Sequence, residues 1–378
     1  LQLAARYEDF SDIGSKSVPK ISFGWQVDDS FYFRGSWSKG FRAPNLVQVN
    51  ETIVSRQIFG VDALLCLQQI NNNGEIDYCD YSFQRVARGS KNLRPEESTN
   101  ISLGIIYEPK NIDNLVFTID WWEIEKEDTI GLFGEDNILL SDLVLRMETN
   151  NISDCSLVQS SPYVFRDSLE ENEIQEYLQA GICPAGRVTR VEEQYRNLDT
   201  RIISGFDFSA RYLVNSDYGN FNFIVNISKL EKFRQKAGND FIELIDAQEK
   251  GIIPEELAIT GFSDLIEKDG SPKIQANFKF LWNRGSWGLG LFGRHIGEFY
   301  ETRNKLSDGR LWKVKAYNTI NTFIDYNFKI SGSQSNLRFG INNIADERAP
   351  LASDIFGYYI DKHDNLGRSY YINFIHRY

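Results

Sequence analysis

The chain has 378 residues, and its 53 acidic and 41 basic side chains give a formal net charge of −12 at pH 7. A nucleic-acid-binding protein needs a basic surface to meet the phosphates, so this charge argues against a nucleic-acid partner. The sequence contains no run of about 18 apolar residues, which excludes a helical membrane protein.

The aromatic content indicates a chain rich in β-structure. The sequence has 26 Phe, 18 Tyr and 7 Trp but a single Met, and aromatic residues are enriched in strands. The chain begins at Leu1, without a methionine or a basic and apolar leader. We therefore expect it to be part of a longer protein.

Twelve segments alternate apolar and polar side chains, which is the period of a strand with one apolar face. They cover residues 1–7, 21–27, 31–37, 101–107, 115–121, 206–214, 221–227, 274–282, 287–293, 320–330, 337–341 and 370–378. In the clearest segment, 320–330, Ile320, Ile324 and Phe328 fall on one face, whereas Asn321 and Asp325 fall on the other. We predict a strand in each segment.

The connections between these segments alternate between short and long. Short connections cover residues 28–30, 109–114, 216–220, 283–286 and 331–336, and long ones cover 45–98, 131–197, 232–270, 298–315 and 343–368. The first connection, 11–19, is brief although it falls in the long series. Several loops above about 15 residues are uncommon in a compact domain, so the long loops must share one side for a reason.

A bacterial outer-membrane β-barrel explains these features. Its strands cross the membrane in ~9 to 11 residues, its side chains alternate between lipid and lumen, and its loops are long only on the outside. Hydrocarbon offers no hydrogen-bond partner, so the sheet must close. Trp25, Trp37, Trp121, Trp282 and Trp287 lie near strand ends, as an aromatic belt requires. The strands of a soluble β-sandwich or propeller also alternate apolar and polar side chains, but such a fold does not require long loops on one side.

Four motifs resemble the barrel of TonB-dependent outer-membrane receptors. Residues 37–46 read WSKGFRAPNL, residues 92–100 read NLRPEESTN, residues 337–346 read LRFGINNIAD and residues 368–372 read RSYYI. They occur in the order that the family shows. Each motif alone is weak evidence for this family, whereas four motifs in the family's order are specific evidence for it.

The resemblance implies an all-β fold, namely an antiparallel transmembrane β-barrel of about 22 strands with a plug in its lumen, of which about twelve strands are seen here. Residues 1–378 are then expected to be the C-terminal portion of the barrel, with the plug domain and early barrel strands absent from this chain. Barrels of twelve strands also exist, so the strand count by itself does not require a larger barrel.

The resemblance also implies a function in the bacterial outer membrane. Receptors of this family capture a nutrient outside the cell and pass it to the periplasm when the TonB energy-coupling complex pulls on the plug. The expected ligand is a ferric siderophore, haem, cobalamin or an oligosaccharide. The expected partners are outer-membrane lipid, the TonB complex through the plug, and the small-molecule or oligosaccharide ligand, and we expect a monomer. A passive porin and a surface-binding barrel that transports nothing are the alternatives.

Two groups of residues are candidates for ligand contact. Arg34, Trp122, Asp325 and Arg338 belong to the predicted lumen face, where hydration of the lumen or contact with a plug is the other interpretation. Aromatic side chains in the long loops could stack on a planar or sugar ligand, or could simply pack the loops together. This second group comprises Tyr78, Tyr81, Tyr163, Tyr195, Phe299, Tyr300, Trp312, Tyr358 and Tyr359.

The last strand resembles the terminal aromatic signal that the outer-membrane assembly machinery recognises. Tyr370, Ile372, Phe374 and Tyr378 alternate on one face, and His376 interrupts them. A last lipid-facing strand without a further role gives the same pattern.

The four cysteines fall into two pairs, each inside one long connection. Cys66 precedes Cys79 and Cys155 precedes Cys183, which suits disulfides in an oxidising compartment. A zinc site would need C-x-x-C spacing or nearby histidines, which the sequence lacks.

We expect no metal site, no cofactor and no enzymatic activity. The segment 71–77 is similar to a calcium loop but lacks its first acidic ligand and its distant Glu. No nucleophile elbow, metalloprotease motif or phosphate loop is present.

Overall fold

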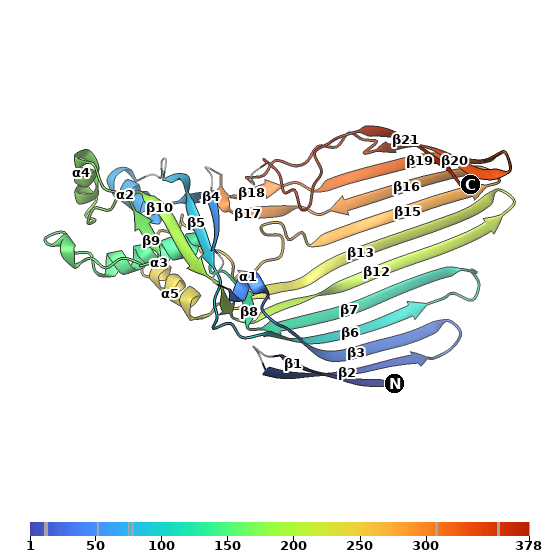
Figure 1. The fold of residues 1–378 in the computed structure, drawn as a ribbon, viewed down its shortest axis with the longest axis horizontal. Helices are drawn as coiled ribbons and strands as arrows, with labels where there is room; N and C mark the ends of the chain where they lie inside the picture. The colour runs from blue at the N-terminus through green and yellow to red at the C-terminus, as the bar shows by residue number, and fades with distance from the viewer. Residues whose placement is uncertain are drawn as a thin grey trace.

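Twelve antiparallel strands form one sheet in the computed structural model, which describes residues 1–10, 14–50, 53–74, 76, 79–306, 309–353 and 356–377 (Figure 1). In sheet order the strands are β1 (Gln2–Phe10), β2 (Gly14–Gln26), β3 (Phe31–Arg42), β6 (Glu96–Tyr107), β7 (Leu115–Glu127), β12 (Arg201–Ser216), β13 (Gly219–Gln235), β15 (Ile274–Arg284), β16 (Trp287–Ile296), β19 (Tyr317–Ile330), β20 (Ser333–Asn342) and β21 (Ser369–His376). A short strand, β14 (Ser263–Asp264), pairs with β13. These strands confirm the twelve predicted segments, and several extend beyond the predicted apolar part.

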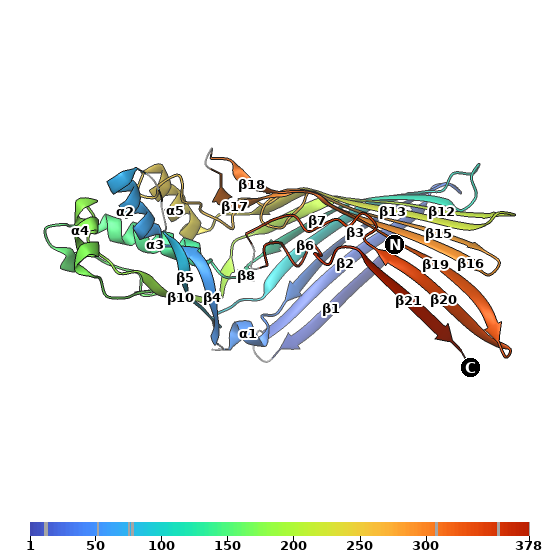
Figure 2. The same ribbon diagram turned by 90° about the horizontal axis from the view of Figure 1, so that it is seen from above.

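The sheet is an open trough. Figure 2 shows the edge strands β1 and β21 bending to the same side of the central strands β12 and β13. Within the described residues, β1 pairs only with β2 and β21 pairs only with β20. No helix in this part of the chain is both long and apolar enough to span a membrane.

The two faces of the sheet carry different side chains. Between β12 and β13, Phe208 lies opposite Ile227, whereas the neighbouring residues Ser209 and Asn226 lie opposite each other and point to the other face. The apolar face is exposed along the whole sheet. Its exposed residues include Phe23, Leu103, Ile105, Ile119, Phe206, Phe223, Ile227, Ile320, Ile324, Leu337, Phe339 and Ile372.

The short turns lie at one end of the strands and the long connections at the other (Figure 1). The turn before β3 is held by Asp28, whose carboxylate accepts the backbone N–H groups of Ser30 and Phe31. The turn between β19 and β20 has positive φ at both Ser331 and Gly332, which is the conformation that joins twisted antiparallel strands by two residues. The predicted alternation of short and long connections is confirmed.

Three of the long connections, 45–98, 131–197 and 232–270, are not irregular loops, because they fold into a separate structured part. We call it the loop domain. It contains β4 (Ile53–Val61), α2 (Ala63–Asn73), β5 (Asp80–Arg88), α3 (Glu135–Glu148), β9 (Val164–Arg166), α4 (Glu171–Gln179), β10 (Val188–Gln194) and α5 (Asn239–Glu249). The four strands form a second sheet in the order β4-β5-β10-β9.

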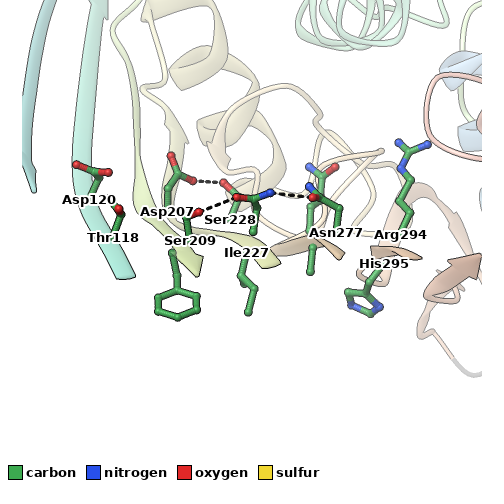
Figure 3. A pocket seen from close by; sticks show the side chains of 13 residues that line it. Thr118, Asp120, Asp207, Ser209, Ile227, Ser228, Asn277, Arg294 and His295 are labelled. Atoms are coloured by element: carbon green, nitrogen blue, oxygen red, sulfur yellow. Dashed lines mark hydrogen bonds between the residues drawn. The ribbon is translucent and has the colours of Figure 1, made fainter. Parts of the chain in front are cut away.

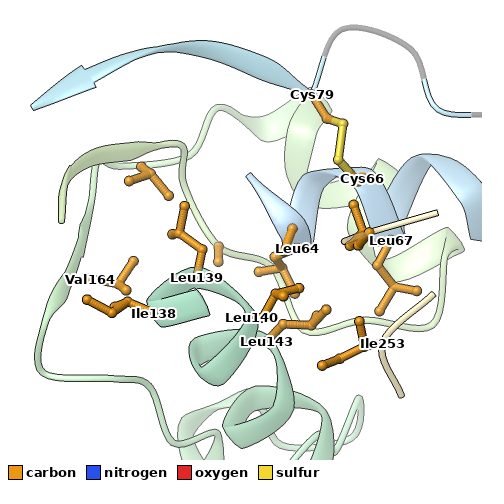
Figure 4. Close-up of a cluster of buried hydrophobic side chains, with 14 of the residues drawn as sticks. Leu64, Cys66, Leu67, Cys79, Ile138, Leu139, Leu140, Leu143, Val164 and Ile253 are labelled. Carbon is orange, nitrogen blue, oxygen red and sulfur yellow. A yellow bond between two sulfur atoms is a disulfide. The ribbon is translucent and has the colours of Figure 1, made fainter. Parts of the chain in front are cut away.

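The loop domain has its own hydrophobic core (Figure 4). Leu64 on α2, Leu139 and Leu143 on α3, and Ile253 after α5 are fully buried in it. The domain forms because these apolar side chains, distant in the sequence, leave water together.

Both expected disulfides are present in the loop domain. One joins Cys66 on α2 to Cys79 before β5, and the other joins Cys155 to Cys183. A 3₁₀ turn (Cys155–Leu157) belongs to the loop domain as well.

Other short elements lie between the sheet and the loop domain or in the last loops. They are α1 (Leu46–Val49), β8 (Thr129–Gly131), β11 (Arg196–Leu198), β17 (Phe299–Lys305) and β18 (Leu311–Val314).

Candidate functional site

An ion pair crosses the polar face of the sheet over a glycine. Arg34 on β3 bonds Asp120 on β7, with Nε 2.8 Å from Oδ1 and Nη2 2.5 Å from Oδ2. Gly104 on β6 lies between them, since it pairs with both residues. A Cβ atom at Gly104 would come 1.9 Å from Asp120 Oδ1 and 2.9 Å from Arg34 Nε. The pair therefore requires glycine at this position.

Next to this pair, a hollow of about 450 Å³ runs over β7, β12, β13, β15 and β16 (Figure 3). A ladder of polar side chains crosses it, because Ser209 Oγ donates to Asn226 Oδ1 and Asn226 Nδ2 donates to Asn277 Oδ1, each at 2.9 Å. Ser228 donates to Asp207 in the adjacent row. The polar face thus presents both donors and acceptors to whatever occupies it.

The other predicted lumen residues lie on the same face. Arg338 Nη2 is 2.6 Å from Asp325 Oδ2, and the guanidinium carbon is 3.7 Å from the ring centre of Phe323. Trp122 lies on this face too, and its Nε1 is buried without a partner in the described chain. The strand pattern therefore located these residues correctly, while their contact with a ligand stays a prediction.

Two of the predicted loop aromatics come together. Tyr163 and Tyr195 line one hollow of about 480 Å³, together with Arg94 and Arg196. Tyr163 is 54% exposed. Tyr195 is half-buried, and its backbone N–H donates to the carbonyl of Arg88. Glu192 and Glu193 line the same hollow, so its two guanidiniums are balanced by two carboxylates. The two rings offer stacking surfaces in a single place.

The two arginines were not selected from the sequence, although Arg94 belongs to the NLRPE segment and Arg196 follows Tyr195 directly. Each bonds a carboxylate, Arg94 to Asp128 and Arg196 to Asp240. Arg196 also lies 4.8 Å from the ring centre of Phe133. A regular strand pattern contains no information about such pairs between separate loops.

A second group of predicted aromatics packs the last two loops together. The rings of Phe299 and Tyr359 meet edge to face at 4.9 Å, and Phe299 is fully buried. Trp312 Nε1 donates to the carbonyl of Leu351 at 3.0 Å. Lys313 Nζ lies 5.8 Å from the ring centre of Tyr300. Tyr358 is half-buried in the same loop as Tyr359.

Tyr81 belongs to the interior of the loop domain. Its hydroxyl donates to Asp62 Oδ2 at 2.7 Å and accepts from the backbone N–H of Val188 at 2.6 Å. Burial, and then the charge of Asp62, raise the pKa of Tyr81 above its ordinary value. Tyr78 lies outside the described residues.

The last strand carries its aromatic side chains on the exposed apolar face. Tyr370, Ile372 and Phe374 are all exposed there. His376 Nδ1 is 2.9 Å from Ser335 Oγ at the end of the strand. Tyr378 lies outside the described residues, so the predicted signal can be followed only as far as Phe374.

An unpredicted ion cluster holds the loop domain together. Arg166 on β9 bonds both oxygens of Asp62, at 2.9 and 3.0 Å, and Asp142 on α3 at 3.2 Å. Its side chain is 6% exposed and both carboxylates are fully buried. Within the described residues, no three acidic, His or Cys side chains are placed to hold a metal ion.

The model of one protein family, "TonB dependent receptor-like, beta-barrel", matches residues 1–344. Among curated proteins, the probable TonB-dependent siderophore receptor PirA of Acinetobacter baumannii is 27% identical over 128 residues, which are 34% of this chain and 15% of that protein. This family and this relative are receptors rather than enzymes.

Two solved structures share the fold. The siderophore receptor PirA from Acinetobacter baumannii superposes with a TM-score of 0.56 at 18% identity, covering 98% of this chain and 42% of that one. The ferric enterobactin receptor PfeA from Pseudomonas aeruginosa gives 0.56 at 14% identity, covering 98% and 41%. The chain therefore spans less than half the length of these relatives.

Proposed function

Since the chain belongs to the TonB dependent receptor-like β-barrel family, we propose that it is part of an outer-membrane receptor that takes up a ferric siderophore into the periplasm, driven by the TonB complex. The relatives that support this substrate are the PirA and PfeA receptors, whose names specify a siderophore and ferric enterobactin. Haem, cobalamin and oligosaccharides are the other ligand classes that uptake assays must include.

The observation that carries the proposal is the exposed apolar face of the twelve-strand sheet. Soluble proteins rarely expose contiguous apolar patches of more than a few hundred Å², yet this face runs over every strand from β2 to β21. Opposite it, the strands carry ion pairs and an amide ladder. Lipid on one side and a polar lumen on the other account for both faces.

The open edges of the trough support a larger barrel. In hydrocarbon, the free N–H and C=O groups of β1 and β21 need partners, because each unpaired group costs several kcal/mol (order of magnitude). We propose that residues 1–378 are the C-terminal portion of a barrel of about 22 strands, and that early strands and a plug domain complete the protein. The plug then contacts the TonB complex, and the barrel functions as a monomer.

In this proposal, the hollow with Tyr163 and Tyr195 binds the ligand first, at the end with the long loops. Arg34, Trp122, Asp325 and Arg338 line the path below it. The rings of Tyr163 and Tyr195 provide stacking area for a planar ligand.

Uptake of radioactive iron tests this function. A deletion strain that expresses the full-length protein should accumulate ⁵⁵Fe from ferric enterobactin or another ferric siderophore in a panel, and only with an intact TonB complex. Tyr163→Ala/Tyr195→Ala should weaken the affinity for the ligand, and uptake at limiting ligand, about thirtyfold, from two lost stacking contacts of about 1 kcal/mol each. Tyr218→Ala, an exposed tyrosine in the turn after β12, is the matched control. Equal uptake by the deletion strain and the complemented strain for the whole panel would contradict the proposal.

Labelling of single cysteines tests the orientation. A label at Asn72 in the loop domain should be reached from outside intact cells, whereas labels at Asp217 and Asn283, at the ends of β12 and β15, should react only after the periplasm is opened. The opposite pattern would reverse the proposed topology. Conductance through the purified protein without a plug would instead favour the passive porin.

A further inference from the structure

A polar groove of about 460 Å³ lies between α2 and α4 in the loop domain. Figure 1 shows both helices near the end of the molecule that is opposite the short turns. Six carboxamide side chains line the groove, namely those of Gln68, Gln69, Asn72, Asn73, Asn172 and Gln179. This site is separate from the hollow of Tyr163 and Tyr195, since the two share no lining residue.

The groove is held in a fixed shape. Asn72 Nδ2 donates to the carbonyl of Glu176 on α4 at 2.9 Å, and Asn71 Nδ2 donates to the carbonyl of Ala180 at 3.0 Å. The Cys66–Cys79 disulfide ties α2 to the segment before β5. A binding site whose walls are already ordered loses less conformational entropy when a ligand arrives.

One acceptor in this groove has no partner within the described chain. Asn72 Oδ1 is buried and accepts no hydrogen bond, although the Nδ2 atom of the same side chain donates to Glu176. A buried acceptor without a donor costs free energy, which a turn of the Asn72 amide towards a hydroxyl in the groove would recover.

The charges of the lining disfavour an anionic ligand. The charged residues are Glu173, Glu176 and Arg187, and Arg187 Nε lies 3.6 Å from Glu173 Oε1. Two carboxylates and one guanidinium leave a net charge of −1, which repels phosphates, carboxylates and anionic chelates.

We propose that this groove binds a neutral oligosaccharide and attaches the receptor to a glycan outside the cell, independently of the uptake function. A carboxamide has two donors and an acceptor oxygen in one plane, and so can bond two adjacent sugar hydroxyls at once. Leu65 and Leu169 in the same lining provide apolar contact for the C–H face of a sugar ring.

The test is calorimetric titration of the full-length protein in detergent with maltohexaose, cellohexaose, mannohexaose and chitohexaose as neutral probes, and with hexagalacturonate as the anionic probe. At least one neutral hexasaccharide should bind, and more tightly than hexagalacturonate. Asn172→Ala/Gln179→Ala should weaken that binding about tenfold, because two hydrogen-bonding groups are lost. Both residues are exposed on or beside α4, so their truncation should leave the fold intact.

The matched control is Gln57→Ala/Gln175→Ala, which removes two exposed carboxamides on β4 and on α4 that do not line the groove. Its affinity should equal that of the unmodified protein. Equal weakening in both double variants, tighter binding of hexagalacturonate, or no binding of any neutral probe at millimolar concentration would overturn the proposal. Iron uptake measured in the same strains separates the two functions, since the groove variant should retain it.

Discussion

At the residue scale, a single missing Cβ atom permits the central ion pair of the polar face. Arg34 and Asp120 meet only because Gly104 leaves the space between them empty. The strand pattern identifies Arg34 and Asp120 as facing the same side, but it does not show that a glycine must lie between them.

Gly104→Ala should lower the free energy of unfolding by about 1–3 kcal/mol, because the new methyl group overlaps the Asp120 carboxylate. Thermal unfolding in detergent measures this loss. Repeating the substitution in an Asp120→Ala background is the control, since it removes the atom that the methyl group meets. An equal loss in both backgrounds would show that the backbone, and not the ion pair, requires the glycine.

The buried cluster of Arg166, Asp62 and Asp142 ties β9 to the start of α2 and to α3. Arg166→Ala should lower the stability of the loop domain by about 3–5 kcal/mol, because Asp62 stays buried without its cation, whereas Asp142 keeps its ion pair with Arg146. Limited proteolysis and thermal unfolding measure the loss. Arg56→Ala, on the exposed side of β4, is the control and should change stability by less than about 0.5 kcal/mol.

A partial rescue gives the second check of this cluster. Asp62→Asn in the Arg166→Ala background removes the charge that has lost its cation and should recover part of the stability. If the double variant is no more stable than Arg166→Ala, the cost comes from the lost side-chain volume rather than from charge.

At the element scale, an imidazole is one of the contacts between the last long connection, 343–368, and the rest of the protein. His363 is 4% exposed, and both ring nitrogens are buried without a partner in the described chain. Its ring stacks on Phe299 of β17 at 6.1 Å and meets Tyr317 of β19 edge to face at 5.2 Å. The imidazole thus acts as an aromatic packing residue.

This packing predicts an acid-sensitive loop. Burial, followed by the positive charges of Arg294 and Lys362, lowers the pKa of His363 below its usual 6.5. The unfolded chain then binds a proton that the folded chain does not, so stability is complete above pH 6.5 and falls as the pH drops towards the folded-state pKa. The slope is at most about 1.4 kcal/mol per pH unit.

Thermal unfolding between pH 5 and 8 measures this effect. His363→Phe keeps the ring and removes the titration, so the variant should lose this part of the pH dependence and be at least as stable at pH 5.5. His295→Phe is the control, because His295 lies outside the packing of His363 with Phe299 and Tyr317. Unlike His363, it has a polar contact, with Nδ1 2.7 Å from Asn318 Oδ1. An unchanged pH profile in His363→Phe would show that other groups cause the acid sensitivity.

At the scale of the whole molecule, successive residues of each strand belong to opposite faces of the sheet, one apolar and one polar. Asn226 and Ile227 are neighbours in the middle of β13 and point to opposite faces. Ile227→Arg should cost about 2–4 kcal/mol if Ile227 faces the bilayer centre, whereas Asn226→Arg should be tolerated on the polar face.

Two measurements detect this difference. One is the change in electrophoretic mobility of the folded barrel on heating, and the other is the amount of the protein at the cell surface. Ile227→Arg should reduce both, while the neighbouring Asn226→Arg should leave them close to those of the unmodified protein. Equal effects of the two substitutions would argue against lipid on the apolar face.

The local pattern of the sequence determined the strands, their two faces, the ends at which short and long connections lie, and the pairing of the four cysteines. These features depend on neighbours in the sequence, because a strand turns each successive side chain to the opposite face and its turns need only a few residues. The four motifs also assigned the family that the comparison with residues 1–344 confirms.

The tertiary structure alone decided how the long connections are built. Their core and ion cluster join residues far apart in the chain, since Asp62 bonds Arg166 across 104 positions and Asn72 bonds Glu176 across 104. The same holds for Tyr163 and Tyr195, which share one hollow, and for Phe299, which is buried in packing. Helical segments inside mixed loops show little periodicity, and their apolar residues acquire a common face only when distant segments meet and exclude water.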